Sequence, residues 1–413
     1  MPLDCSLSHA DSGLLQPSLY VHVPFCMSRC TYCDFHSSAP DRTALSAIAP
    51  RWLAAVERHL AQLSQRFEFS GFSTIYVGGG TPSFLPSDIL AGALSAIAES
   101  GVANGNVAIE WSIEANPEDI DADFLSIISS HGVNRLSIGV QTLEDEARRL
   151  AGRRGSADAT RRILDMIAAR WPDRRSADLM YGLPAQSAAG LAKDVRALVD
   201  RGFGHISLYE LTLEDGTPME RGARAGSLAL PDDDERADQY DAACEELLSA
   251  GFDHYEVSNW ALPGQECIHN MHYWNMDDWL AVGPSGVGNV NIGAGRFMRL
   301  ENSADDAIYF DDPSGSVHEV LVTGLDAMFE SLMLALRTSR GFGLVAFAER
   351  FGHDAVEVFG PLHELFAESV ILEAGRWRAT ARGMDTLNRV LVRALSNSER
   401  FYDRLHSNDE GTR

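Results

Sequence analysis

Three cysteines near the start of the chain could bind metal. Cys26, Cys30 and Cys33 follow the sequence Leu-Tyr-Val-His-Val-Pro-Phe at residues 19–25. Three thiolates at this spacing can each bind one iron of a cubane iron–sulfur cluster. A [4Fe-4S] cluster has four irons, so one iron would keep an open coordination position. Catalytic zinc sites bind water or substrate at such a position, and we expect a cofactor or substrate here.

Other uses of these cysteines fit the sequence less well. A structural zinc site needs a fourth ligand, for which His22 and His36 are near, but C-x3-C-x2-C is an unusual zinc spacing. Residues 1–18 have neither a basic start nor an apolar core, so we expect no secretion signal and a cytoplasmic location. Thiols stay reduced in the cytoplasm, which disfavours disulfides.

Size and charge limit the other classes of function. A chain of 413 residues can bury one large core and a smaller one. Its net charge of −25 argues against binding nucleic acid through phosphates. No apolar run is long enough to span a bilayer, which leaves peripheral membrane contact open. One group of arginines could still form a basic patch, but it lies on a predicted helical stretch, where we expect a solvated face. Its members are Arg148, Arg149, Arg153, Arg154, Arg161 and Arg162.

The positions of apolar residues predict alternating strands and helices over the first half of the chain. The predicted strands are residues 19–23, 74–77, 107–113, 135–140, 177–180 and 205–211. The predicted helices are residues 44–66, 86–99, 121–131, 144–151, 157–170 and 188–200. Such alternation indicates an α/β fold with a parallel sheet, and six units indicate an incomplete (β/α)6 barrel.

Polar and small residues gather where these strands end. They are Cys26, Gly79, Glu114, Gln141, Asp178 and Glu210. Barrel enzymes build their active sites from the carboxyl ends of several strands, so we expect these residues to surround one site.

The rest of the chain follows a different pattern. A helix is predicted at residues 232–250, and residues 269–295 are rich in aromatics and glycine, as expected of a segment that covers an open barrel edge. Helices at residues 327–336, 344–351, 362–373 and 386–395, with a strand at 377–379, predict a small helical, winged-helix-like domain. The predicted regions are a flexible segment 1–18, a barrel 19–215, an extension 216–322, a C-terminal domain 323–396 and a fraying tail 397–413.

Several short motifs, in this order, resemble the HemN-like family of radical S-adenosylmethionine (SAM) proteins. They are Tyr20-Val-His-Val-Pro-Phe-Cys26, Gly78-Gly-Gly-Thr-Pro82, Glu114-Ala-Asn-Pro117, Gly139-Val-Gln141, Asp178-Leu-Met-Tyr-Gly-Leu-Pro184 and His269-Asn-Met-His-Tyr-Trp274. The resemblance extends from Tyr20 to about residue 395. It implies a cluster on the three cysteines, SAM on the open iron, and cleavage of SAM to a 5′-deoxyadenosyl radical.

The resemblance also assigns roles within a SAM site. Gly79, Gly80 and Thr81 would let the backbone approach the SAM amino group, because they lack bulky side chains. The other implied contacts offer suitable hydrogen-bonding groups. Glu114 and Asp178 would accept from ribose or face the sulfonium, Arg153 would bind a carboxylate, Gln141 would donate and accept, Tyr20 would line the site and the backbone at Tyr32 would contact adenine.

Position 35 separates branches of this family. The oxidases resemble C-x3-C-x2-C-x-C, whereas this chain has Phe35 where they have the further cysteine, as in the heme-chaperone branch. The motif at residues 269–274 is associated with heme in that branch, and a neutral imidazole such as His269 is a normal heme ligand. The alternative is a buried histidine satisfied by hydrogen bonds. The turn at residues 282–286 departs from the branch pattern.

The resemblance therefore implies a protein that binds heme and delivers it to an acceptor protein, with SAM, the cluster and an electron donor as further partners. One alternative is oxygen-independent coproporphyrinogen III oxidase, which decarboxylates two porphyrinogen propionates. Another is a radical SAM transferase that acts on a tetrapyrrole. Phe35 favours the heme-delivering protein over the oxidase.

Overall fold

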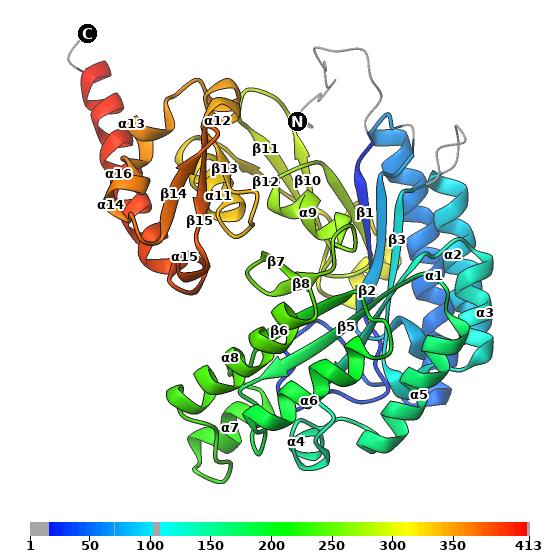
Figure 1. The fold of residues 1–413 in the computed structure, drawn as a ribbon. Helices are drawn as coiled ribbons and strands as arrows, with labels where there is room; N and C mark the ends of the chain where they lie inside the picture. The colour runs from blue at the N-terminus through cyan, green and yellow to red at the C-terminus, as the bar shows by residue number, and fades with distance from the viewer. Residues whose placement is uncertain (1–15, 70, 102–107, 411–413) are drawn as a thin grey trace.

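The computed structural model describes residues 16–69, 71–101 and 108–410. Within these residues, twelve strands form one continuous sheet, and a second sheet has three strands (Figure 1). The order in the large sheet is β12-β11-β10-β9-β1-β2-β3-β4-β5-β6-β8-β7.

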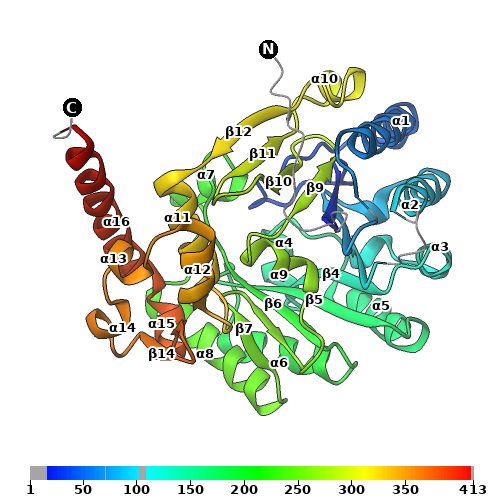
Figure 2. The same ribbon diagram turned by 90° about the horizontal axis from the view of Figure 1, so that it is seen from above.

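The middle of the large sheet is the predicted barrel. The parallel strands are β1 (Ser18–Val23), β2 (Thr74–Gly79), β3 (Glu110–Ala115), β4 (Arg135–Gln141), β5 (Arg174–Tyr181) and β6 (His205–Glu210). The helices between them are α1 (Arg42–Arg66), α2 (Ser87–Gly101), α3 (Ala122–Ser130), α4 (Asp145–Leu150), α5 (Ala157–Arg170) and α6 (Ala188–Val199), with short 3-10 turns at Pro82–Phe84 and Pro117–Asp119. Figure 2 shows α1, α2, α3 and α5 on the outer side of the sheet. The predicted α/β fold with an incomplete barrel is confirmed.

Alternating residues divide the strands between two faces. In β1, Leu19, Val21 and Val23 are fully buried in the same apolar cluster as Trp52 and Val56 of α1. Tyr20 and His22 lie on the opposite face, because successive side chains of a strand point to opposite sides. That face is the barrel interior.

One further parallel strand was not predicted. β9 (Trp279–Val282) pairs in parallel with β1, so it extends the barrel on the side away from β2. It comes from the segment expected only to cover the open edge. More than 250 residues separate β9 from β1 in the chain, so local periodicity could not reveal their pairing.

The remaining strands of the large sheet are antiparallel. On one side they are β10 (Val287–Asn291), β11 (Phe297–Glu301) and β12 (His318–Val322), and on the other β8 (Asn259–Ala261) and β7 (Asp253–Glu256). The helices of this region are α7 (Pro218–Arg224), α8 (Asp233–Ser249), α9 (Ile268–Trp274) and α10 (Asp306–Asp311). No helix among the described residues is both long enough and apolar enough to cross a membrane.

The C-terminal domain has a core of its own, which includes Leu332, Phe359 and Trp377. Its helices are α11 (Gly324–Ala335), α12 (Leu344–Phe351), α13 (Ala355–Phe359), α14 (Leu362–Leu365), α15 (Ala381–Asp385) and α16 (Leu387–Glu410). Its strands are β13 (Phe342–Gly343), β14 (Val370–Glu373) and β15 (Arg376–Ala379). In Figure 2 this domain lies on the side of the molecule opposite α1 and α2.

Two predictions for this domain were wrong. The helix expected at residues 362–373 is one helical turn, α14, followed by strand β14, which forms a hairpin with β15. Ala374 and Gly375 both have positive φ angles, 47° and 73°, as a two-residue hairpin turn requires. The tail expected from residue 397 continues α16 to Glu410. Of the segment 1–18, residues 1–15 lie outside the described residues, and Ser18 already belongs to β1.

Candidate functional site

The three motif cysteines lie in the loop that follows β1. Backbone hydrogen bonds hold the base of this loop, from Cys26 N to Ser38 O and from Ser38 N to Pro24 O, both 2.8 Å. Thr31 N donates to Ala151 O at 3.1 Å, which ties the loop to the end of α4. Cys26, Cys30 and Cys33 all line one cavity of about 340 Å³.

Each of two cysteines receives a hydrogen bond from another strand's loop. Thr81 Oγ1 donates to Cys26 Sγ at 3.3 Å, and Arg153 Nη1 donates to Cys30 Sγ at 3.4 Å. Burial raises the pKa of the Cys26 thiol, and the bond from Thr81 lowers it. Burial likewise raises the pKa of Cys33. Iron displaces these protons when it binds, because the thiolate is the ligand form.

The arrangement of the three cysteines is compatible with a cluster. Among the described residues, no three His, Cys, Asp or Glu side chains lie close enough together to hold one metal ion. In a cubane each thiolate binds a different iron, so the sulfurs need not converge on one point. Three thiols around one cavity, two of them with hydrogen-bond donors, therefore fit a [4Fe-4S] cluster.

The glycines after β2 bring two loops into direct contact. Gly80 N donates to Val23 O at 2.7 Å, and Thr81 N donates to Phe25 O at 2.8 Å. A Cβ atom on Gly80 would stand 2.7 Å from Phe25 O. Gly79 has a φ angle of +106°, and a Cβ there would meet the His22 ring at 2.6 Å. The chain's own packing therefore demands glycine here, before any cofactor is considered.

Two acidic side chains form part of the cavity wall. Glu114 Oε2 accepts from Gly79 N at 3.1 Å, and Glu114 Oε1 accepts from the Tyr76 hydroxyl at 2.8 Å. Burial, and then the charge of Asp178, raise the pKa of Glu114 to about 7. Burial raises the pKa of Asp178 to about 6. A cationic ligand would return both groups to their charged forms.

A cation and an amide lie at the same rim. Gln141 lines the cavity at the end of β4, with a φ angle of 66° beside a register shift in the sheet. Arg153 Nη2 donates to Asn116 Oδ1 at 2.9 Å and to Gly139 O. Burial opposes the charge of Arg153, but the facing Tyr32 and Cys30 outweigh it, so its pKa is raised. One cavity thus offers two kinds of partner. Its carboxylates can bind a cation or accept hydrogen bonds from hydroxyl groups, and its guanidinium can bind a carboxylate.

Comparison with known proteins shows the family to which this chain belongs. Residues 20–198 match the radical SAM superfamily, and residues 322–385 match the HemN C-terminal domain. The chain is 35% identical to heme chaperone HemW of Mycobacterium tuberculosis, over 88% of this chain and 93% of that protein. It is 30% identical to heme chaperone HemW of Lactococcus lactis, over 93% and 98%. The chain belongs to the HemW branch of the HemN-like radical SAM family.

A solved structure shares the fold. Coproporphyrinogen III oxidase (HemN) from Escherichia coli matches with a TM-score of 0.77 and 20% identity, over 92% of this chain and 90% of that chain. The matched length includes the barrel and the C-terminal domain. Members of the radical SAM superfamily carry a [4Fe-4S] cluster and SAM, and the three cysteines and the cavity beside them suit both.

Most of the predicted SAM residues of this HemW-branch protein meet in the cavity. Its lining includes Tyr32, Gly79, Gly80, Thr81, Glu114, Gln141, Arg153 and Asp178. Tyr20 is the exception, because it lies closer to the amino end of the barrel. Its hydroxyl is 3.0 Å from His22 Nδ1, and its ring stacks at 6.3 Å on that of Tyr76.

Sequence reasoning assigned no role to several other lining residues. They are Asn116, Met180, Tyr209, Thr212 and Glu214. Asn116 and Met180 belong to the quoted motifs at residues 114–117 and 178–184, and the last three lie near or after the end of β6. Position after a strand's carboxyl end was therefore a usable signal for most of them.

The arginine group does not form the single exposed helical face that was expected, because its members lie in α4, in α5 and in the loop between them. Arg148 is only 1% exposed, and its Nη2 pairs with Glu118 Oε1 at 2.7 Å. Arg153 lines the cavity. Arg149 does match the expectation, because it is well exposed and pairs with Glu146 of the same helix. The expectation failed for Arg148 because its partner lies 30 residues away in another loop.

His269 lies at the opposite end of the barrel from the cysteines. It is 0% exposed, and its Nδ1 is 2.8 Å from the hydroxyl of Thr74, the first residue of β2. Its Nε2 is 2.7 Å from the Tyr273 hydroxyl. Both ring nitrogens are thus engaged, which matches the alternative of a buried histidine satisfied by hydrogen bonds. Heme contact at His269 stays a prediction that this geometry does not favour.

Proposed function

We propose that this protein is a heme chaperone, which binds heme and transfers it to acceptor proteins. The observation that carries the proposal is the similarity to heme chaperones along almost their whole length, in the barrel and the C-terminal domain alike. A match confined to the cluster loop would support no more than radical SAM chemistry.

The mouth of the cavity favours this function over the oxidase. Phe35 lines the cavity and is 65% exposed, at the position where the oxidases have a further cysteine. A benzyl group can neither bind iron nor donate a hydrogen atom as a thiol does. The fold likeness to coproporphyrinogen III oxidase does not decide between the two, because one fold can carry different activities.

The same proposal includes the cofactor site. Cys26, Cys30 and Cys33 would hold the cluster, which would supply an electron to SAM when both are bound. Arg153 would bind the SAM carboxylate, and Glu114 and Asp178 would bind ribose hydroxyls or face the sulfonium. Tyr32, Gln141 and the backbone of Gly79, Gly80 and Thr81 would complete the cavity wall. We place the protein in the cytoplasm, where reduced thiols persist.

The deciding experiment offers both ligands to the same preparation. Protein purified and reconstituted with iron and sulfide under anaerobic conditions is titrated with heme and followed by its absorption spectrum. A parallel sample receives coproporphyrinogen III, SAM and a strong reductant. We expect saturable heme binding at about one heme per chain and no decarboxylated product.

Two results would contradict the proposal. Decarboxylated porphyrinogen formed over many turnovers would make the protein an oxidase. Heme that binds the native protein no more tightly than it binds the same protein after heat denaturation would make heme an adventitious ligand. Transfer is then tested by mixing heme-loaded protein with an apo-cytochrome and measuring whether heme leaves faster than by spontaneous dissociation.

A further inference from the structure

A column of side chains runs through the barrel from α9 to the cavity. At the amino end, His269 is paired with Thr74, and its ring lies 5.3 Å from that of Tyr76. The Tyr76 hydroxyl donates to Glu114 Oε1 at 2.8 Å. Glu114 Oε2 in turn accepts from Gly79 N at 3.1 Å, in the segment that borders the cysteines. Each member touches the next.

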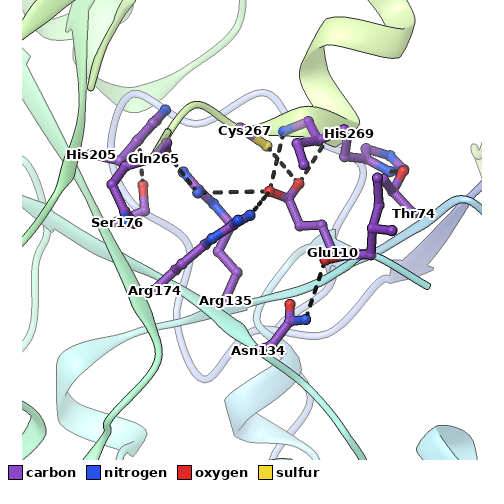
Figure 3. A network of polar contacts seen from close by, with 12 residues as sticks. Thr74, Glu110, Asn134, Arg135, Arg174, Ser176, His205, Gln265, Cys267 and His269 are labelled. Atoms are coloured by element: carbon purple, nitrogen blue, oxygen red, sulfur yellow. Dashed lines mark hydrogen bonds and ion pairs between the residues drawn. The ribbon is translucent and has the colours of Figure 1, made fainter. Parts of the chain in front are cut away.

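The base of this column is fixed by a buried carboxylate, Glu110, at the start of β3 (Figure 3). Glu110 is 0% exposed and accepts from the backbone amides of Ile268 at 3.1 Å and His269 at 2.9 Å. Its charge is matched by Arg174 at 3.4 Å and Arg135 at 3.8 Å. A buried charge with several partners of this kind holds its neighbours in one arrangement. The first turn of α9 is therefore anchored to the amino ends of β3, β4 and β5.

Gly78 shows how tightly the upper part of the column is packed. A Cβ atom at this position would stand 2.9 Å from Glu114 Oε2 and 2.9 Å from the Tyr76 ring. Glycine at 78 therefore leaves the space in which the tyrosine and the carboxylate meet. This requirement is separate from those of Gly79 and Gly80, which face His22 and the cluster loop.

We propose that Tyr76 is a positioning residue for SAM. Its hydroxyl and the Gly79 amide hold the two oxygens of Glu114 in the orientation that the cofactor meets, and His269 of α9 holds the Tyr76 ring. The histidine segment of α9 thus supports the SAM site from beneath. The inference rests on the proposed contact between Glu114 and SAM.

Tyr76 affects the orientation of Glu114 because its hydroxyl is one of two donors to that carboxylate. A carboxylate held by two fixed donors has one orientation, whereas a carboxylate held by one can rotate about its Cγ–Cδ bond. Loss of the Tyr76 hydroxyl leaves Glu114 Oε1, in a half-buried side chain on the cavity wall, without its donor, and such a group shifts towards any other partner. The ring of phenylalanine would preserve the packing against His269 and Tyr20, so only the hydrogen bond is tested.

The first measurement is SAM affinity in Tyr76→Phe. Cluster-loaded protein is titrated with SAM, and binding is followed by equilibrium dialysis and by the change in the electron paramagnetic resonance spectrum of the reduced cluster. We expect the SAM dissociation constant to rise about tenfold, with iron content unchanged. We expect the rate of SAM cleavage at saturating SAM to stay within about threefold of wild type. A purely structural defect would instead lower this rate together with the iron content.

A double-mutant cycle shows whether Tyr76 acts through Glu114. In a Glu114→Gln background, Tyr76→Phe should weaken SAM binding less than about twofold further. Tyr309→Phe is the matched control, since its hydroxyl is also buried and accepts from a backbone amide, that of Gly283, outside the column. Its SAM affinity should equal that of wild type.

Wild-type SAM affinity in Tyr76→Phe would overturn the inference and leave the proposed function standing. Additive losses in the double mutant would also overturn it. If wild-type protein itself bound no SAM, the proposed site would fall together with the inference. Should Tyr76→Phe not fold, Thr74→Val decides, because it releases His269 at a distance from the cavity. We expect it to weaken SAM binding about threefold, and an unchanged affinity there would overturn the inference.

Discussion

Arg153 Nη1 lies 3.4 Å from Cys30 Sγ, although 123 residues separate the two in the chain. The same guanidinium donates to Asn116 after β3 and to Gly139 in β4. One side chain thus joins the cluster loop to the loop after β3 and to strand β4. Its charge lies where a SAM carboxylate would need a partner, beside the cysteines that would hold the cluster.

Arg153→Met should weaken SAM binding at least tenfold, because it removes a charge-assisted pair from the cavity. Arg149→Met is the matched control, since Arg149 lies in α4, four residues before Arg153, and is exposed. Isothermal titration of the cluster-loaded variants with SAM gives both affinities. Equal affinities would remove Arg153 from the site.

Changing any one of Cys26, Cys30 or Cys33 to Ala should remove most of the iron from a reconstituted protein that otherwise holds about four irons per chain. Cys244→Ala should keep its iron, since Cys244 lies on α8 and does not line the cavity. Iron and sulfide analysis after anaerobic reconstitution measures this. Full iron content in a Cys30→Ala protein would exclude the cluster assignment.

Gly80→Ala should disturb both the cluster and SAM binding. The resemblance assigned glycine here to the approach of SAM, and the structure adds that a Cβ atom would press on Phe25 O, next to Cys26. We therefore expect reduced iron content as well as weak SAM binding. Gly222→Ala, in helix α7 with ordinary contact distances, is the control. A Gly80→Ala protein with full iron and no SAM binding would restore the simpler explanation.

The sequence predicted the rim of the barrel well, because its residues lie in or just after the carboxyl half of strands that their own periodicity reveals. Glu114, Gln141 and Asp178 were placed in this way, and they line one cavity. Tyr20 was assigned to the site by resemblance, yet strand register puts it level with Tyr76, below the lining. A position near a motif does not show how deep in the barrel a side chain lies.

Contacts between distant segments were not predictable in the same way. Nothing local indicates that β9 pairs with β1 or that Glu110 anchors α9. The hairpin of β14 and β15 was a different failure, since its turn signal was present. Gly375 is a residue that a two-residue hairpin turn favours, and it stands between two short apolar segments. The segment before it was assigned to a helix instead.

SAM affinity should rise with pH between about 6 and 8. The pKa values of Glu114, about 7, and Asp178, about 6, are raised by burial, so both carboxyls are largely neutral at pH 5.5 and ionised at pH 8. A cationic cofactor binds the ionised forms, so the affinity is lost as pH falls through these values. We expect about a tenfold loss from pH 8 to pH 6.

Glu114→Gln should remove the part of this dependence near pH 7 and leave the part near pH 6. Titrations of SAM in buffers with different ionisation enthalpies also report the proton released on binding. An affinity independent of pH, in a wild-type protein that keeps its cluster throughout, would show that neither carboxylate meets the cofactor.

His269→Ala separates two roles for the histidine of α9. A heme ligand would have to expose a ring nitrogen, whereas Nδ1 and Nε2 are paired with Thr74 and Tyr273 in a fully buried position. Loss of an iron ligand changes the absorption spectrum of bound heme, because the axial ligand sets the electronic state of the iron. Loss of a support beneath Tyr76 would leave that spectrum alone and weaken SAM binding.

We expect the second result, with the heme spectrum unchanged and the SAM dissociation constant raised about threefold. His318→Ala serves as the control, since His318 is well exposed on β12 and touches neither Tyr76 nor the cavity. Both ligands are titrated into the same anaerobic preparation of each variant, so a folding defect would lower the two affinities together. A shifted heme spectrum with normal SAM affinity would instead make His269 a heme ligand, and α9 would then have to open at the amino end of the barrel to let heme in.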